Sequence, residues 1–162
     1  MKSLIVYSSR TGNTYKLAHA FWQGIPGDKQ IYSAEATPDP SLFDFVALAF
    51  WLNDGKPDQK SMQYLAKIGS KPLFLMATHG SAKGSAMVEN ALGHAKGLTS
   101  KAMIVGTYTT QGRVSPLVIE RYTSMPDPPA WIADACAAES HPSQQELDEL
   151  KAIAARISST YQ

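Results

Sequence analysis

The stretch "SLIVYSSRTGNTYK", residues 3–16, carries the strongest structural signal in the chain. Residues 3–7 form a short apolar run typical of a buried strand, and residues 15–22 repeat apolar side chains at helical spacing. The turn between them is rich in hydroxyls, with a glycine that permits close backbone approach. Such a turn at a helix N-terminus suits an anion, because free N–H groups and the helix dipole favour negative charge. The alternative is a plain N-capped turn, for which Ser9 or Thr11 would suffice.

The rest of the chain repeats this order of a strand-like run followed by a helix-like run. The last helix has the clearest start, because Ser143 and Glu146 form a capping-box pattern. Five strands that alternate with helices predict parallel crossovers, and hence an α/β fold with a three-layer, doubly wound parallel sheet. We expect further strands at about 30–33, 45–51, 72–78 and 102–108, and helices at about 57–68, 85–96 and after 143.

Composition describes one soluble globular domain over residues 1–162, with residues 110–141 as an irregular embellishment before the last helix. No apolar run approaches the length of a membrane span, and the apolar start is too short for a signal peptide, so a cytoplasmic protein is expected. A net charge of +1 gives no case for nucleic acid. The single cysteine, Cys136, lies in an alanine-rich stretch typical of a small buried hydrophobe, and the histidines show no metal-ligand spacing.

The segments that follow the expected strands are similar in composition. All are rich in glycine and hydrogen-bonding residues, and in an open parallel sheet they meet at the carboxyl edge, where ligands bind at the topological switch point. Nucleotide-binding motifs with G-x-x-x-x-G-K-[ST] or G-x-G-x-x-G spacing are absent from the sequence. The segments are "SSRTGNT" (8–14), "WLNDGKPD" (51–58), "THGSAKGS" (78–85) and "TYTTQGR" (107–113).

With these segments the chain resembles the flavodoxin family. "SSRTGNT" resembles its phosphate loop, an aromatic residue follows the third strand, and a glycine-rich loop follows the fourth. "FWLNDGKPD" (50–58), "TQGR" (110–113) and "HPSQQELDEL" (141–150) resemble a short flavodoxin-like subgroup. The resemblance implies strand order 2-1-3-4-5 and non-covalent FMN at the switch point. It also implies an electron-transfer protein that exchanges electrons with a redox partner protein, such as a reductase or acceptor enzyme.

The resemblance further implies which residues hold FMN. The phosphate would lie on the first loop, and the flavin ring would lie between the later loops, with Trp51 and Tyr108 as possible walls. Four of the implied positions also have a structural alternative. Trp51 could be a core aromatic, and Tyr108 could simply end its strand. Residues 53–55 could form a simple turn, and His79 could face solvent. The implied FMN-binding residues are Ser8, Ser9, Arg10, Thr11, Gly12, Asn13, Thr14, Trp51, Leu52, Asn53, Asp54, Gly55, Thr78, His79, Gly80, Ser81 and Tyr108.

Two rival functions remain open at this stage. Flavodoxins are typically very acidic, whereas this chain has 15 Lys and Arg against 14 Asp and Glu. That balance favours a flavoenzyme of the same fold, such as an NAD(P)H:quinone reductase or a protoporphyrinogen oxidase, with residues 110–141 as a platform for substrate or partner. A receiver-like signalling module would need clustered acids after the first strand, where this chain has Ser8 and Ser9.

Overall fold

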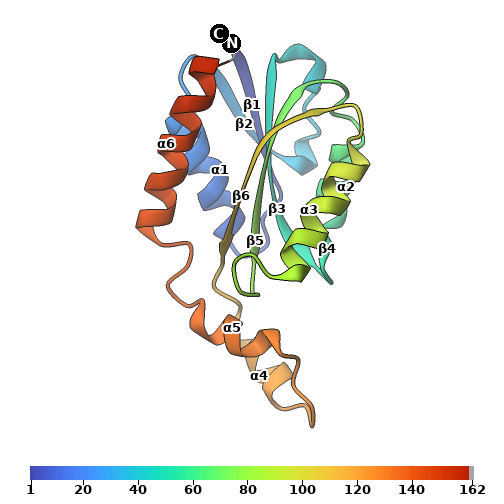
Figure 1. The fold of residues 1–162 in the computed structure, drawn as a ribbon, viewed down its shortest axis with the longest axis vertical. Helices are drawn as coiled ribbons and strands as arrows, with labels where there is room; N and C mark the ends of the chain where they lie inside the picture. The colour runs from blue at the N-terminus through green and yellow to red at the C-terminus, as the bar shows by residue number, and fades with distance from the viewer. Residues whose placement is uncertain (161–162) are drawn as a thin grey trace.

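A computed structural model describes residues 1–160 and shows one parallel sheet with helices on both of its faces (Figure 1). Two short 3-10 helices, η1 (Ala34–Ala36) and η2 (Pro40–Leu42), follow the second strand. The strands are β1 (Lys2–Tyr7), β2 (Asp28–Ser33), β3 (Phe45–Asn53), β4 (Lys56–Pro57), β5 (Pro72–His79) and β6 (Met103–Gln111). The helices are α1 (Asn13–Gly24), α2 (Gln59–Leu65), α3 (Ala86–Leu98), α4 (Pro116–Thr123), α5 (Trp131–Ala137) and α6 (Gln144–Thr160).

The sheet has the order β2-β1-β3-β5-β6, and all four neighbouring pairs on this path are parallel. These are the five expected strands, so the predicted fold class and strand order are confirmed. The sixth strand, β4, was not predicted and pairs antiparallel with the end of β3. Asp54 and Gly55 both have positive φ between these two strands. An Asp-Gly pair favours the two-residue turn of a hairpin, which explains the extra strand.

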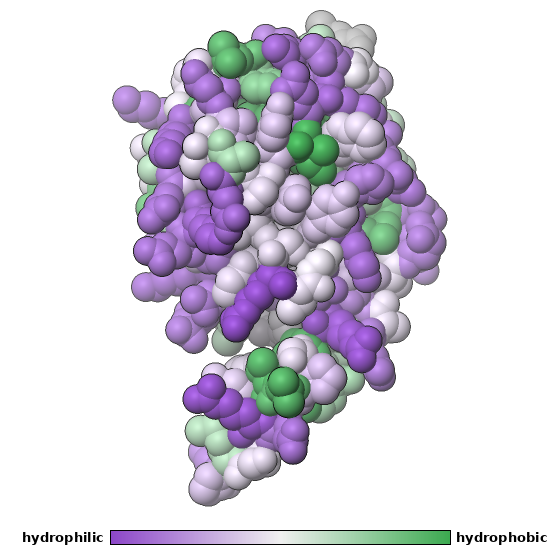
Figure 2. Space-filling model, turned by 180° about the vertical axis from the view of Figure 1, so that it is seen from behind, coloured by the Kyte–Doolittle hydropathy of each residue, from purple (hydrophilic) through white to green (hydrophobic). Residues whose placement is uncertain are grey.

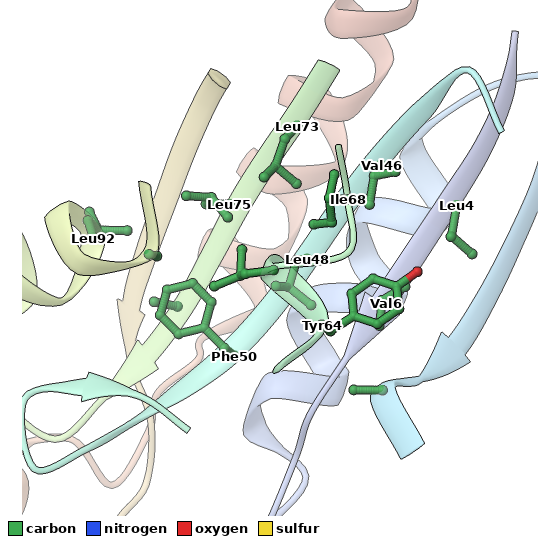
Figure 3. Close-up of a cluster of buried hydrophobic side chains, with 14 of the residues drawn as sticks. Leu4, Val6, Val46, Leu48, Phe50, Tyr64, Ile68, Leu73, Leu75 and Leu92 are labelled. Carbon is green, nitrogen blue, oxygen red and sulfur yellow. The ribbon is translucent and has the colours of Figure 1, made fainter. Parts of the chain in front are cut away.

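The core consists of two hydrophobic clusters, one on each face of the sheet. One cluster joins the side chains of β1, β3 and β5 to α2 and α3, with Tyr64, Ile68 and Leu92 among its members (Figure 3). The other joins the opposite face to α1 and α6 through Phe21, Leu150 and their neighbours. Consecutive residues of the central strand β3 feed the two clusters alternately, as expected for a strand covered on both sides.

Most predicted elements are confirmed, but several boundaries differ. Strand β6 continues to Gln111, three residues beyond the predicted end. Helix α6 begins with the predicted capping box, which is confirmed: the Glu146 carboxylate accepts from the Ser143 N–H at 2.7 Å, and the Ser143 hydroxyl accepts from the Glu146 N–H at 3.3 Å. The stretch 110–141 is more regular than expected, because it holds the last residues of β6 and two short helices.

We call residues 116–137 the α4–α5 hairpin. It projects beyond the carboxyl ends of β5 and β6 (Figure 1), and Figure 2 shows it as a separate lobe below the body of the protein. Its helices contact each other through the edge of Tyr122 against Trp131, with ring centroids 5.2 Å apart. Helix α4 contains no buried residue, and Leu117 is 76% exposed. The hairpin therefore lies at the ligand edge of the sheet without a core of its own.

Among the helices within residues 1–160, none combines the length and the apolar character that crossing a lipid bilayer would require.

Candidate functional site

The segment from Ser8 to Thr14 connects the end of β1 to the first turn of α1, and we call it the phosphate loop after the resemblance stated above. The Ser8 N–H donates to the carbonyl of Ala49 at 3.0 Å, which fixes the loop to the neighbouring strand. Gly12 then takes a left-handed conformation with φ of 95°, and its N–H donates to the Ser9 hydroxyl at 3.1 Å. A residue with a side chain would be strained at this φ. Glycine at this position therefore allows the chain to turn from β1 into α1.

Side chains of this loop bind three distant segments. The Ser8 hydroxyl donates to Asp58 at 2.7 Å, and the hydroxyls of Thr14 and Thr78 share a hydrogen bond of 2.8 Å. The Asn13 amide donates to the carbonyl of Arg113 at 2.9 Å. The other two hydroxyls of the segment also have partners within the protein: Ser9 accepts from the Gly12 N–H, and Thr11 accepts from the Asn13 amide at 3.3 Å. All four hydroxyls therefore help to hold the loop in place.

The backbone of the same loop fits an anion. Within residues 1–160, no acceptor faces the N–H groups of Ser9, Arg10 and Thr11. The first N–H groups of α1 also lack helical acceptors, as at any helix start. Free N–H groups, the positive end of the α1 dipole and the exposed Arg10 guanidinium together match a phosphate in charge and hydrogen-bonding capacity. The donor set therefore fits the phosphate of FMN.

A hollow of about 380 Å³ lies beside this loop. Trp51 stands half-buried in its wall near the end of β3, and the Arg10 guanidinium lies 5.8 Å from the centroid of the indole ring. The hollow thus combines an aromatic wall, a cation and hydroxyl groups next to the free N–H groups. Its lining residues are Ser8, Ser9, Arg10, Trp51, Asn53, Asp58, Gln59 and Lys60.

The β3–β4 turn carries the next predicted residues. Asn53 and Asp54 are exposed at its tip, while Leu52 packs against the core cluster next to α3. A Cβ on Gly55 would lie 3.5 Å from the side chain of Met87, at the start of α3. The structure places 53–55 at the ligand edge and shows that they form a hairpin turn, so a contact with the cofactor remains a prediction.

The end of β5 brings the third group of predicted residues to the same edge. His79 is only 5% exposed, so the alternative of a solvent-facing histidine is wrong. Its Nδ1 lies 2.8 Å from the carbonyl of Ser81, which makes Nδ1 the protonated nitrogen. Burial lowers the pKa of His79, against the opposing effect of the Ser81 carbonyl. The buried Nε2 of this histidine has no partner among the described residues.

Tyr108 is not at the ligand edge, contrary to our expectation. Because β6 continues to Gln111, Tyr108 lies three residues inside the strand and is 6% exposed. Its hydroxyl donates to the carbonyl of Glu146 and to the Glu149 carboxylate, at 3.0 and 2.9 Å. Burial raises the pKa of this phenol. The side chain fastens α6 to the sheet, and we leave it out of the candidate site.

A second hollow, of about 410 Å³, opens on the other side of the phosphate loop. Thr11 and Asn13 face it from the loop, and residues 113–116 and 139–142 close it from the segments around the α4–α5 hairpin. Lys16, Arg113 and His141 are its basic residues, and Glu139 is its acidic one. The sequence predicted no function for this second hollow.

Two features of the site were missed by sequence reasoning. Asp58 is 3% exposed beneath Ser8, although its N-cap position before α2 was a readable signal. The base of α5 contacts the loop after β5: the Asp134 carboxylate accepts from the Ala82 N–H at 3.2 Å. A Cβ on Gly80 would lie 3.7 Å from Trp131. No local sequence pattern predicts the contact of α5 with the loop after β5.

Cys136 and metal ligation complete the survey of reactive groups. Cys136 is exposed on α5, so its expected role as a small buried hydrophobe is wrong. Within residues 1–160, no three His, Cys, Asp or Glu side chains come together in a way that could hold a metal ion.

Comparisons with known proteins bear on the family. The chain is 28% identical to the flavodoxin-like domain-containing protein BilS of Clostridioides difficile (strain CD3), over 95% of this chain and 94% of that protein. Its fold is similar to oxidised flavodoxin 2 from Bacillus cereus (TM-score 0.66, 12% identity, 99% of this chain and 100% of that one). It is also similar to general stress protein 14 of Treponema denticola in complex with FMN (TM-score 0.59, 9% identity, 100% of both chains).

The sequence profile of the flavodoxin domain matches residues 4–155, nearly the whole chain. This match includes the phosphate loop, the β3–β4 turn and the end of β5. The resemblance stated from the sequence is confirmed, and FMN is supported as the cofactor by both the family and the donor set of the loop. The chain belongs to the flavodoxin domain family.

Proposed function

We propose that this protein binds FMN at the carboxyl edge of its sheet and transfers electrons to or from a redox partner protein. The phosphate binds the N–H groups of Ser9, Arg10 and Thr11 at the start of α1. The ring lies in reach of Trp51 and of the β5 end. The observation that carries this proposal is the set of free N–H groups, held at a helix N-terminus beside an aromatic-walled hollow.

When bound, FMN supplies the one- and two-electron chemistry. The chain's own residues then need only bind and orient the cofactor. Thr14 and Thr78 fix the loop to β5, Arg10 offers positive charge beside the phosphate position, and Trp51 shields one side of the hollow from water. His79 is held neutral by burial, so it adds no positive charge next to the ring at neutral pH.

The purified protein tests the proposal directly. We expect it to contain FMN, identified by its absorption spectrum and by chromatography after release. The cofactor-free protein should bind FMN more tightly than riboflavin, and inorganic phosphate should compete with FMN but not with riboflavin. Thr11→Ala removes an exposed hydroxyl that lies beside the free N–H groups and accepts from the Asn13 amide at 3.3 Å, so it should weaken FMN binding while riboflavin binding stays unchanged. Equal affinities for FMN and riboflavin in the unaltered protein would refute the phosphate site.

A flavoenzyme of the same fold is the second candidate, favoured by the balanced charge of 15 basic and 14 acidic residues. A strongly acidic surface helps a carrier dock on basic partners, and this chain lacks that charge excess. Steady-state oxidation of NAD(P)H with a quinone acceptor by the FMN-loaded protein would decide for the enzyme. An electron carrier would show slow turnover alone and faster turnover when a reductase is added.

A further inference from the structure

The second hollow, of about 410 Å³, is walled by three parts of the chain. Thr11, Asn13 and Lys16 come from the phosphate loop and α1. Residues 113–116 lead into α4 and residues 139–142 follow α5, so both ends of the α4–α5 hairpin border the hollow. Its volume lies in the range of small-molecule pockets, about 300–1,000 Å³. It shares no lining residue with the hollow beside Trp51, so a ligand in it need not displace the flavin.

Hydrogen bonds hold the wall of this second hollow in a fixed shape. The Arg113 N–H donates to the His141 carbonyl at 2.9 Å, and the Arg113 carbonyl accepts from the Asn13 amide at 2.9 Å. A Cβ on Gly112 would lie 2.8 Å from Nδ2 of Asn13, so the chain passes close to the phosphate loop here. The His141 ring is held in turn by the Glu146 carboxylate, 2.8 Å from Nδ1. A wall that is already ordered spares a ligand the cost of ordering it.

The charges on this wall are unbalanced. Lys16 and Arg113 are exposed, and neither forms an ion pair within residues 1–160. The lining contains one carboxylate, Glu139, which is exposed and also forms no ion pair in that part of the chain. The hydroxyls of Ser115 and Ser140 have no hydrogen-bond partner among the described residues. Two permanent cations and two free hydroxyl donors therefore border one cavity, and an anion in it would offset the repulsion between the cations.

We propose that the second hollow is an oxyanion site, separate from the FMN phosphate position, for a phosphate or carboxylate group of a small molecule. The Arg113 guanidinium has the planar set of N–H donors that pairs with two oxygens of such a group, and the Lys16 ammonium adds a point charge. A bound oxyanion joins α1 to the root of the α4–α5 hairpin. That the small molecule lies beside the cofactor rests on the proposed function, whereas the oxyanion site itself does not.

The experiment uses the FMN-loaded protein, because the cofactor then fills its own phosphate position. Pyrophosphate and succinate are the probes, and calorimetry at constant ionic strength measures their affinities. We expect saturable binding, tighter for pyrophosphate if the group is a phosphate and tighter for succinate if it is a carboxylate. Arg113→Gln should weaken this binding about tenfold, the usual size for a lost hydrogen bond to a charged group. Lys16→Gln should weaken it about threefold, because a single exposed charge is screened by water.

Matched variants separate a specific site from general surface charge. Arg113→Lys should keep part of the affinity, since it retains the charge and loses the planar donor set. Arg121→Gln removes an exposed arginine of α4 outside the hollow and should leave the affinity unchanged.

Three results would overturn the oxyanion site. They are the absence of saturable binding of either probe, equal losses in Arg113→Gln and Arg121→Gln, and binding that FMN abolishes, which would assign the hollow to the phosphate of the cofactor. If the unaltered protein binds no FMN, the proposed function fails instead, and the same titrations of the FMN-free protein still test the oxyanion site.

Discussion

The phosphate loop and the α4–α5 hairpin lie at the same edge of the sheet but are held in opposite ways. Ser8, Thr14 and Asn13 of the loop bind partners 50, 64 and 100 residues away in the chain. The hairpin has no buried residue in α4, and α5 contributes only Ile132 and Ala135 to the interior. A segment with many distant supports is fixed in position, whereas a segment with few supports owes its place to one or two contacts.

The largest effect on stability is expected for a substitution at the end of α1, the helix that follows the phosphate loop. A Cβ on Gly24, the last residue of α1, would lie 2.3 Å from the carbonyl oxygen of Lys151 in α6. Because that atom is backbone, the two helices must separate. Gly24→Ala should lower the free energy of unfolding by about 3 kcal/mol or more. Chemical denaturation measures this change.

The control for this variant is Gly93→Ala, inside the exposed face of α3, where a Cβ meets nothing within 4 Å. Alanine should stabilise that helix by up to about 1 kcal/mol. A stable Gly24→Ala protein would show that α1 and α6 can adjust freely.

The next effect compares a packed and an exposed side chain of the hairpin. Trp131→Ala removes the contacts with Tyr122 and with the Gly80 loop, and should cost about 1–3 kcal/mol of stability and weaken FMN binding. Leu117→Ser changes a side chain that is 76% exposed and should alter stability by less than about 0.5 kcal/mol. Similar losses in the two variants would mean that the whole hairpin packs as one unit.

Trp51 tests whether the fixed region extends to the wall of the hollow. An aromatic pair contributes about 0.5–1.5 kcal/mol beyond area burial, so Trp51→Ala should weaken FMN binding by roughly threefold to tenfold. The fluorescence of the bound flavin should rise, because the indole no longer quenches it. Trp51→Phe should keep part of the affinity. Unchanged flavin fluorescence in a folded Trp51→Ala protein would remove this residue from the site.

The smallest expected effect is a pH dependence of stability that arises from His79, at the end of β5. The His79 carbonyl accepts from the Gly112 N–H at 2.9 Å, and burial lowers the pKa of the His79 ring. The unfolded chain therefore binds a proton more readily, so stability from this group is complete above about pH 6.5 and is lost as the pH falls. His79→Asn should show a smaller decrease in Tm than the unaltered protein between about pH 7.5 and about pH 5. His94→Gln, at an exposed position, should leave the decrease unchanged.

The sheet and the phosphate loop could be predicted because their signals are local. Apolar runs mark the strands, and Gly12 with its hydroxyl neighbours marks the turn. Tyr108 was misplaced because the end of β6 is set by its pairing with β5, where His79 lies opposite Gln111, and the intervening polar residues gave no sign of a strand. Asp58 was missed because its partner, Ser8, is far away in the sequence.

The α4–α5 hairpin could not be predicted for a related reason. Its helices are only eight and seven residues long, and its prolines at 126, 128 and 129 resemble an irregular loop. What holds it is the contact of α5 with the loop after β5, through Asp134 and Ala82. Such contacts depend on the folded sheet and leave no periodic trace in the sequence.

The bond from Asn13 to the carbonyl of Arg113 also bears on how the protein is made. During synthesis, the phosphate loop emerges among the first residues, while its last partner follows 100 residues later. Contacts of such long sequence separation form late in folding. A nascent chain that ends before β6 has the loop without its Arg113 support and the sheet without its edge strand, so it should bind no FMN. The cofactor then reports on completion of the chain, and truncated products can be recognised by their lack of colour.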